Sequence, residues 1–312
     1  MPKANFLKML LAGAACTALV ACDTPPVRVI APGSSAQPDV LAPPTPKSAD
    51  ARAYYSQVQQ SLLSQGLMRT DGGGKNTPFT DRTLADNFIR IAMFDEYSRE
   101  TSGFVRQETA SRLRRWVVPI RVGIRFGATI PEDRQATDRA RIGSYLSRLS
   151  GLTNHPMRID EANPNFWIYI VSEDEREALG PKIRAALPSL SAADVAGITA
   201  MPRSTYCLVY ALSEGTSGAY TRAFAVIRAE HPDLLRLSCL HEEMAQGLGL
   251  ANDSPSARPS IFNDDEEFAL LTDQDELMLR ILYSPELRPG MTLEQVRPIV
   301  ESLATRLMGG ET

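Results

Sequence analysis

The segment from His231 to Asp253 constrains the chain most, because its apolar side chains recur with the period of a helix. Pro232 suits the first position of a helix, and Gly247 and Gly249 supply a glycine stop. One side carries Leu237, Leu240, Met244 and Leu248, and the other carries Leu235, Ser238, Glu242, Gln246 and Gly249. The pattern predicts an amphipathic helix with a core-facing back and a polar front.

The polar front of this predicted helix resembles the active-site motif of zinc peptidases. In the register that starts at His241, the second metal ligand would be Ala245, which has no donor atom. One residue further on, the sequence EExxQxxGLxND, from Glu242 to Asp253, is similar position by position to the HExxHxxGLxHD of the metzincins. The resemblance implies that Glu242, Gln246 and Asn252 occupy the three ligand positions. It also implies that Glu243 occupies the place of the general base.

These ligand positions hold one carboxylate and two neutral amides, whereas catalytic zinc is held mainly by imidazole, thiolate and carboxylate groups. We therefore expect no metal cofactor. The alternative is zinc, or a hard divalent cation that prefers oxygen ligands, bound weakly through Glu242, Gln246 and Asn252. Without a metal ion a water molecule keeps a pKa of about 15.7 instead of about 7, and a lone Glu cannot make up that difference. Glu243 is therefore the catalytic base only if the site is active. Asp253 and His241 complete the expected cleft residues.

A second stretch, Leu271 to Tyr283, reads LTxxDxxxLxxLY and resembles the LSxxDxxxLxxLY helix that closes many metzincin domains. Upstream, alternation and apolar runs predict strands at Arg115 to Phe126, Phe166 to Val171, Cys207 to Leu212 and Tyr220 to Arg228, with helices at Pro131 to Leu149 and Glu173 to Leu187. This order is also the layout of the upper half of a zincin. We expect an α+β fold in which residues 111–308 form a zincin-like mixed sheet with the motif helix.

The N-terminus predicts export and lipid attachment. Residues 1–21 have a positive start, an apolar run and the lipobox Leu19-Val20-Ala21-Cys22, which resembles that of bacterial lipoproteins. The resemblance implies lipidation of Cys22 and a place in the cell envelope, anchored in a membrane and facing the periplasm, and Asp23 favours the inner membrane. Residues 22–50 are rich in Pro, Ala and Ser and predict a tether, and residues 51–110 predict a helical segment with helices at Ala51 to Met68 and Asp81 to Tyr97.

Two of the four cysteines remain for the folded domain once Cys16 leaves with the signal and Cys22 is lipidated. An exported chain favours a disulfide between Cys207 and Cys239, which would stabilise the fold by about 3–4 kcal/mol through loop closure. The alternative is a thiol metal site of Cys239 and His241, but these lie about 200° apart on the helix. The disulfide is the preferred reading.

Charge and motifs exclude several classes of function. The net charge is −4 and no basic patch is interleaved with aromatic residues, so nucleic acid is not an expected partner. The chain has no glycine-rich phosphate loop and no Gly-x-Ser-x-Gly, the motifs of common nucleotide-binding proteins and serine hydrolases. The acidic run Asn263 to Glu267 lacks the spacing and the glycine of an EF-hand, so it predicts a solvated loop.

The segment from about Thr80 to Met291 also resembles an uncharacterised family of bacterial lipoproteins and secreted proteins, a domain of unknown function. The likeness is carried by RWVVPIRV at Arg115, Cys207, Cys239, EEMAQGLGLAND at Glu242 and LTDQDELMLRILYSPELRPGM at Leu271. Three functions remain open. We favour a degenerate zincin that binds peptide, protein or cell-wall material without turnover. The alternatives are an atypical metal-dependent peptidase with Glu243 as base, and a structural envelope module in which Glu242 and Gln246 bond the loop after Gly249.

Overall fold

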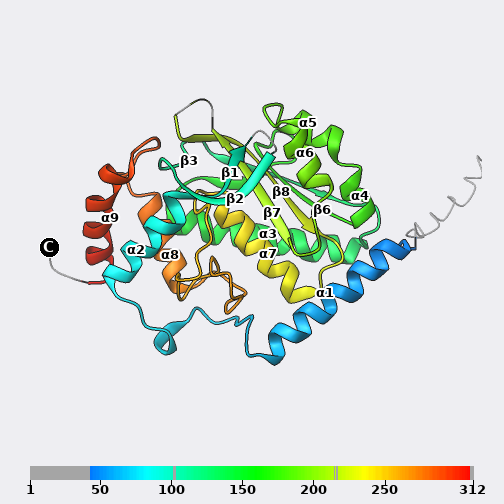
Figure 1. Ribbon diagram of the computed structural model, residues 1–312, viewed down its shortest axis with the longest axis horizontal. Coiled ribbons are helices and arrows are strands. Elements are labelled where there is room, and N and C mark those ends of the chain that lie inside the picture. The colour runs from blue at the N-terminus through cyan, green and yellow to red at the C-terminus, as the bar shows by residue number, and fades with distance from the viewer. Residues whose placement is uncertain (1–42, 101–102, 214, 216, 310–312) are drawn as a thin grey trace, which may run out of the picture. The chain divides into compact units, whose positions relative to one another are not determined.

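A six-stranded sheet forms the centre of the computed structural model, which describes residues 43–100, 103–213, 215 and 217–309 (Figure 1). Its strands are β3 (Arg115–Trp116), β4 (Ile120–Phe126), β5 (Met157–Ile159), β6 (Phe166–Val171), β7 (Cys207–Ser213) and β8 (Ala219–Arg228). The order β3-β8-β6-β4-β5 is parallel throughout. Strand β7 runs antiparallel to β8, its one partner among the described strands. The α+β class is confirmed.

Helices cover both faces of this sheet, as the apolar runs of β6 and β8 require. Side chains such as Ile168 and Ala225 point into a core with helices α2 (Asp81–Ala92), α3 (Glu132–Thr153), α7 (Asp233–Gln246), α8 (Asp273–Leu282) and α9 (Leu293–Leu307). Their neighbours Tyr169 and Val226 point the other way, toward α5 (Gly180–Ala186) and α6 (Ala192–Thr199), which follow the short α4 (Glu173–Glu177). The strand alternation therefore assigns each residue to one of two cores.

The single strand expected from Arg115 to Phe126 is two strands at different places in the sheet. The short β3 pairs with β8, whereas β4 lies between β5 and β6. Val117 and Val118 in the connection are 58% and 42% exposed, so neither side chain lies in the core. Pro119 has no N–H for a sheet ladder and follows the break. The predicted strands at β6, β7 and β8 are confirmed.

The N-terminal part is less helical than the sequence predicted. Helix α1 (Pro46–Ser64) begins inside the expected tether, because Thr45 caps the N–H of Ser48 and Pro46 fits the first turn. A 3-10 turn, η1 (Gly74–Asn76), and helix α2 follow, and α2 ends at Ala92. Residues expected to complete a helical segment to position 110 form a hairpin, β1 (Phe94–Glu100) and β2 (Gly103–Ala110). Glu100 pairs with Gly103 in this hairpin, which sequence pattern did not predict.

Other helices also differ from the predicted ones in their boundaries. The helix expected from Glu173 to Leu187 is divided into α4 and α5, because Pro181 cannot continue α4 and instead lies in the first turn of α5, which begins at Gly180. Strand β5 and helix α6 were not predicted, since each is short. The helix expected within Leu271 to Tyr283 is α8, and its first turn has a capping box of Thr272 and Asp275.

Helix α1 packs on the main body, and both belong to one compact unit. Tyr55 is fully buried in a small core with Leu235 of α7, and the Ser48 hydroxyl donates to Glu230 at 2.6 Å. Among the described residues no helix has the length and apolarity to cross a membrane. The predicted signal peptide, Cys22 and most of the tether lie outside the described residues.

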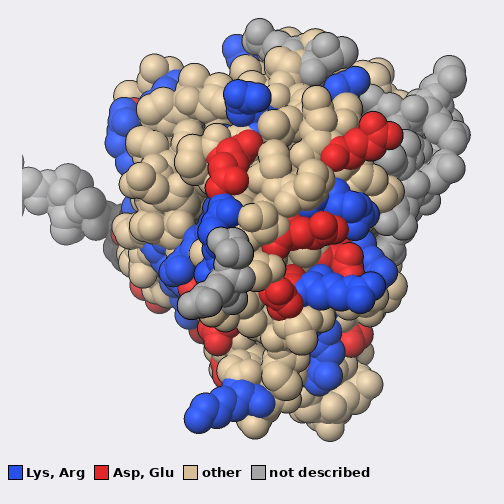
Figure 2. All heavy atoms as spheres, turned by 90° about the vertical axis from the view of Figure 1, so that its left-hand side faces the viewer, with Lys and Arg blue, Asp and Glu red and all other residues tan. Residues whose placement is uncertain are grey.

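On the side of α2 and α9, basic and acidic side chains are intermixed (Figure 2). Asp86 of α2 lies 4.0 Å from Arg82 and 3.8 Å from Arg297 of α9, and Arg306 pairs with Glu286. The Asp86–Arg297 pair joins α2 to α9, but exposed ion pairs of this kind contribute little to stability.

Candidate functional site

The predicted motif helix is α7, which leaves the carboxyl end of β8 and ends at Gly247. Leu240 and Met244 on its back are buried, as expected. The expected polar front is wrong in part, because Ser238 and Gln246 are only 5% and 9% exposed. Helix α1 covers the first turns of α7, where Gln59 accepts the N–H of Leu235 at 2.9 Å. The helix is therefore enclosed on most sides, and its chemistry concentrates where side chains still reach a surface.

Two carboxylates of α7 lie together next to β7. A carboxylate oxygen of Glu242, one of Glu243 and the Sγ of Cys207 all lie within 4.8 Å of one another. Glu242 is half-buried and Glu243 is 2% exposed. Cys207 is bonded to Cys239, so its sulfur is not a thiolate and is a poor metal ligand. The cluster offers two carboxylates to a cation, which is fewer ligands than a protein zinc site normally has.

The two amides at the other ligand positions have protein partners. The Gln246 amide nitrogen donates to Asp253 at 3.0 Å. The Asn252 side chain donates to the carbonyl of Arg90 at 2.9 Å, and its backbone N–H donates to that of Ile91. Asn252 is thereby attached to the end of α2, and Gln246 closes the loop after Gly249.

His241 lies in the core. Its ring stacks on Tyr145 with centroids 4.0 Å apart, and its Nδ1 accepts the N–H of Leu271 at 3.2 Å. Burial, assisted by the charge of Arg148, lowers the pKa of His241 to about 3. The neutral ring therefore links α7 to the chain that enters α8.

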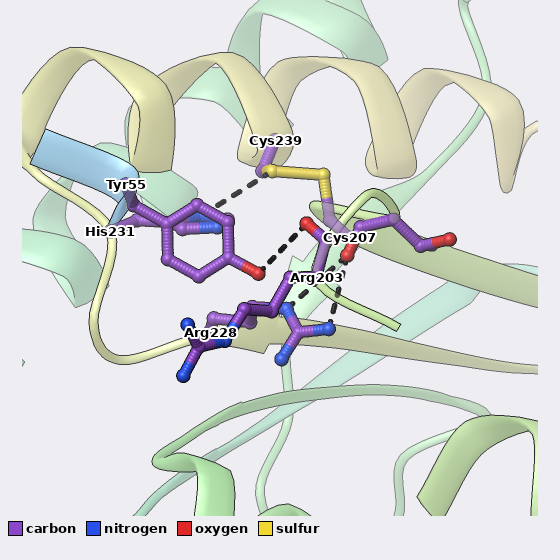
Figure 3. The surroundings of a disulfide bond; sticks show 7 residues. Tyr55, Arg203, Cys207, Arg228, His231 and Cys239 are labelled. Carbon is purple, nitrogen blue, oxygen red and sulfur yellow. Dashed lines mark hydrogen bonds between the residues drawn. A yellow bond between two sulfur atoms is a disulfide. The ribbon is translucent and has the colours of Figure 1, made fainter. Parts of the chain in front are cut away.

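The predicted disulfide between Cys207 and Cys239 is confirmed, and it joins the start of β7 to the middle of α7 (Figure 3). Tyr55 and His231 lie beside it, with ring centroids 4.5 Å apart. The Nδ1 of His231 is 3.7 Å from the Cys239 sulfur. Burial and the nearby Arg228 and Arg236 hold the pKa of His231 well below its usual range, so this ring is also neutral.

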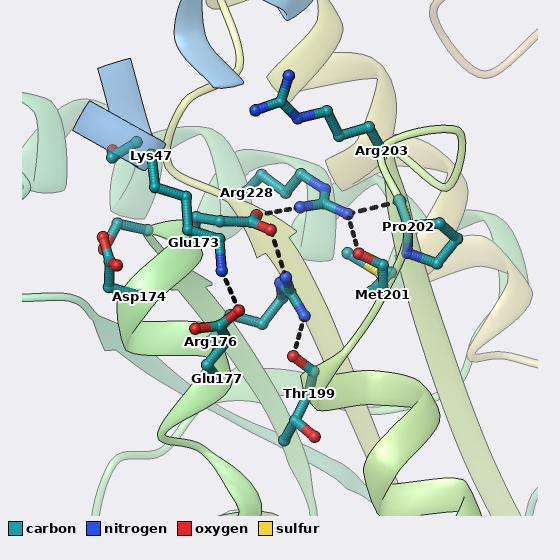
Figure 4. A network of polar contacts seen from close by, with 12 residues as sticks. Lys47, Glu173, Asp174, Arg176, Glu177, Thr199, Met201, Pro202, Arg203 and Arg228 are labelled. Atoms are coloured by element: carbon teal, nitrogen blue, oxygen red, sulfur yellow. Dashed lines mark hydrogen bonds and ion pairs between the residues drawn. The ribbon is translucent and has the colours of Figure 1, made fainter. Parts of the chain in front are cut away.

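A buried ionic network that sequence pattern did not predict joins α4 to the end of β8 (Figure 4). The Glu173 carboxylate pairs with Arg176 at 2.6 Å and with Arg228, and all three side chains are at most 8% exposed. Arg228 also donates to the carbonyls of Met201 and Pro202. The sequence signal for this network was Arg228 and Glu230 at the end of the apolar run AFAVIRAE. Polar residues that follow a buried parallel strand gather at one edge of the sheet, so such residues can be expected to meet there.

Residues 81–302 match the family described as "Protein of unknown function (DUF2927)". The chain belongs to this DUF2927 family. No curated protein and no solved structure matches this DUF2927 chain. The match includes the sheet, α7 and the disulfide, whereas α1 lies outside it.

Proposed function

We propose that the chain is a lipid-anchored protein of a bacterial cell envelope whose zincin-like domain binds extended segments of peptide, protein or cell-wall material without cleaving them. The lipobox before Cys22 supports attachment to a membrane on the periplasmic side, and Asp23 favours the inner membrane. The Pro-rich stretch before α1 supports a spacer between membrane and domain.

The edge of β7 carries this proposal. All seven residues of β7 are half-buried, and β8 is its one partner among the described strands. An edge strand presents N–H and C=O groups with which an extended peptide can pair, adding a strand to the sheet. The carboxylates of Glu242 and Glu243 lie near Cys207, where β7 begins. A peptide with a Lys or Arg side chain at that point would gain a charge-assisted contact.

The zincin likeness supports the same location for a ligand. Parallel strands, an antiparallel edge strand and a motif helix that leaves the last strand follow the layout implied by the EExxQxxGLxND resemblance. The ligand positions hold Glu242, Gln246 and Asn252, and one carboxylate with two amides makes a poor zinc site, which favours binding over metal-dependent cleavage.

The proposal is tested with a library of fluorescent peptides, some with Lys or Arg, by fluorescence polarisation on the purified protein. We expect binding that N-methylation of alternate peptide amides abolishes, because it removes the ladder hydrogen bonds. Glu242→Gln should weaken binding of the basic peptides, and Glu301→Gln on α9 serves as a control. Binding that survives N-methylation, or no binding by any peptide, would refute the proposal.

A metal-dependent peptidase is the second candidate, favoured by the proximity of Glu242 and Glu243. It requires a tightly held ion, cleavage that a chelator stops, and loss of cleavage in Glu243→Gln. Elemental analysis of protein purified without chelator decides between the two: stoichiometric zinc with cleavage establishes the peptidase and overturns the binding proposal.

A structural role is the third candidate, favoured by the hydrogen bond from Gln246 to Asp253. In that case Glu242→Gln changes the free energy of unfolding, and no peptide binds.

A further inference from the structure

A cavity of about 460 Å³ lies at the opposite end of α7 from Glu242 and Glu243. It is formed where β4 and β8 end and α3 and α7 begin, and α1 supplies one wall. In a parallel sheet with helices on both faces, the carboxyl ends of the strands are the usual place for a ligand. The volume is in the range of small-molecule sites, roughly 300–1,000 Å³.

Three arginines line this cavity: Arg52 from α1, Arg134 from α3 and Arg236 from α7. Arg236 is 2% exposed and pairs with the buried Asp138 at 2.8 Å, and Arg134 pairs with Asp233 at 2.6 Å. The Nε atoms of Arg134 and Arg236 are buried and have no hydrogen-bond partner among the described residues. Burial lowers the pKa of Arg236, Asp138 opposes this shift, and Arg134 and Arg52 add to it. An anionic group would therefore relieve repulsion among three cations.

The two helices that begin at the cavity strengthen its preference for an anion. Helices α3 and α7 start after Pro131 and Pro232, and neither has a side-chain hydrogen bond at its N-cap. Each helix N-terminus is equivalent to roughly half a positive charge and presents N–H donors.

Acidic and neutral groups line the same cavity, so a simple anion does not match the whole wall. Asp133, Asp233 and Glu230 contribute to it, with the neutral ring of His231. Glu230 is 1% exposed; one of its oxygens accepts from Ser48 and from the N–H of Glu173, whereas Oε2 has no partner among the described residues. The Nε2 atom of His231 is also buried and has no hydrogen-bond partner among the described residues. Buried polar groups without partners are costly, so a donor from a ligand is favoured there.

We propose that this cavity binds a small zwitterion of the α-amino-acid class. Its carboxylate lies toward the arginines and the N-termini of α3 and α7, and its ammonium group lies toward Glu230 and His231. Because Arg52 and Ser56 come from α1, the segment that precedes the family match completes the site.

Isothermal titration calorimetry of the purified full-length protein tests this, with each common α-amino acid as ligand and with acetate, methylammonium and inorganic phosphate as single-charge probes. We expect at least one amino acid to bind, and each single-charge probe to bind more weakly by roughly 10-fold to 100-fold, the range for hydrogen bonds with charged groups. Binding of none of the amino acids, or binding of phosphate or acetate at least as tight, would overturn the proposal.

Two variants locate the site. Arg52→Gln and Glu230→Gln should each weaken amino-acid binding roughly 10-fold or more. The exposed Arg82→Gln on α2 is the matched control, and Glu242→Gln should have no effect, which separates this site from the proposed peptide site. If Glu230→Gln does not fold, Arg52→Gln on the exposed side of α1 still decides: unchanged affinity in that variant contradicts the assignment.

Discussion

Replacing Glu173 with Gln should be among the most destabilising single changes in the chain. Its carboxylate is the acceptor between the guanidinium groups of Arg176 and Arg228, which are 1% and 0% exposed. Removing one member of a buried ion pair costs about 3–5 kcal/mol, because an uncompensated charge remains in the interior. Gln keeps the size of the side chain but not its charge.

The structure places the cost at the lower end of that range. Arg176 still donates to the carbonyls of Ile198 and Thr199, and Arg228 still donates to Met201, Pro202 and Thr205. These carbonyls solvate the two cations in part. We therefore expect the free energy of unfolding to fall by about 3 kcal/mol.

Urea unfolding followed by circular dichroism measures this difference. The matched control is Glu177→Gln on the same helix, because Glu177 pairs with Lys47 across side chains that are 48% and 44% exposed. An exposed pair of this kind contributes about 0–1 kcal/mol. Equal effects of the two substitutions would show that burial of the Glu173 network does not determine its energy.

Three further predictions concern stability. Replacing Cys207 and Cys239 with Ala should lower the free energy of unfolding by about 3–4 kcal/mol, because the bond spans a sequence separation of 32; a loss below about 1 kcal/mol in urea unfolding would contradict the loop-closure argument. The pKa of His241 falls from 6.5 when unfolded to about 3 when folded, so stability is lost as the pH falls below 6.5. His241→Asn keeps an acceptor for the N–H of Leu271 and should reduce the slope of stability between pH 6 and pH 5 by about 1.2 kcal/mol per pH unit; an unchanged slope would mean that the ring takes up its proton at the same pH in the folded and unfolded protein. Gly249→Ala should cost at least about 2 kcal/mol, because φ is +127° and a Cβ would lie 2.2 Å from the Arg114 carbonyl, whereas Gly151→Ala in α3 meets open space and should change stability by less than about 1 kcal/mol; similar melting temperatures for the two variants would count against this reading.

The expectation of a solvated loop at Asn263 to Glu267 is confirmed for Asp264 and Asp265, which are exposed, but Asn263, Glu266 and Glu267 are buried or half-buried. Glu267 pairs with Arg69 at 2.9 Å and with Arg258, and the carbonyl of Glu266 accepts the N–H of Met68. Burial, followed by repulsion from Asp264 and Asp265, raises the pKa of Glu266 to about 7. Acidic composition indicated exposure, but two of the partners, Met68 and Arg69, come from a segment almost two hundred residues earlier in the chain.

Local pattern was sufficient wherever one element decides its own structure. The apolar runs of β6, β7 and β8 and the proline and glycine limits of α7 each produce their element because burial and backbone preference act over a few residues. The disulfide could be predicted because an exported chain favours disulfides and only two cysteines were expected to remain in the folded domain.

Tertiary structure decided what a side chain faces, because partners distant in sequence set that. The motif alone could not indicate that Asn252 bonds the end of α2, that His241 stacks on Tyr145, or that α1 covers the first turns of α7. Nor could it indicate that the loops after β4 and β8 enclose a cavity with Arg52 of α1. Periodicity determines which face of an element is apolar, but only the packing of the whole chain determines which polar groups meet and which remain for a ligand.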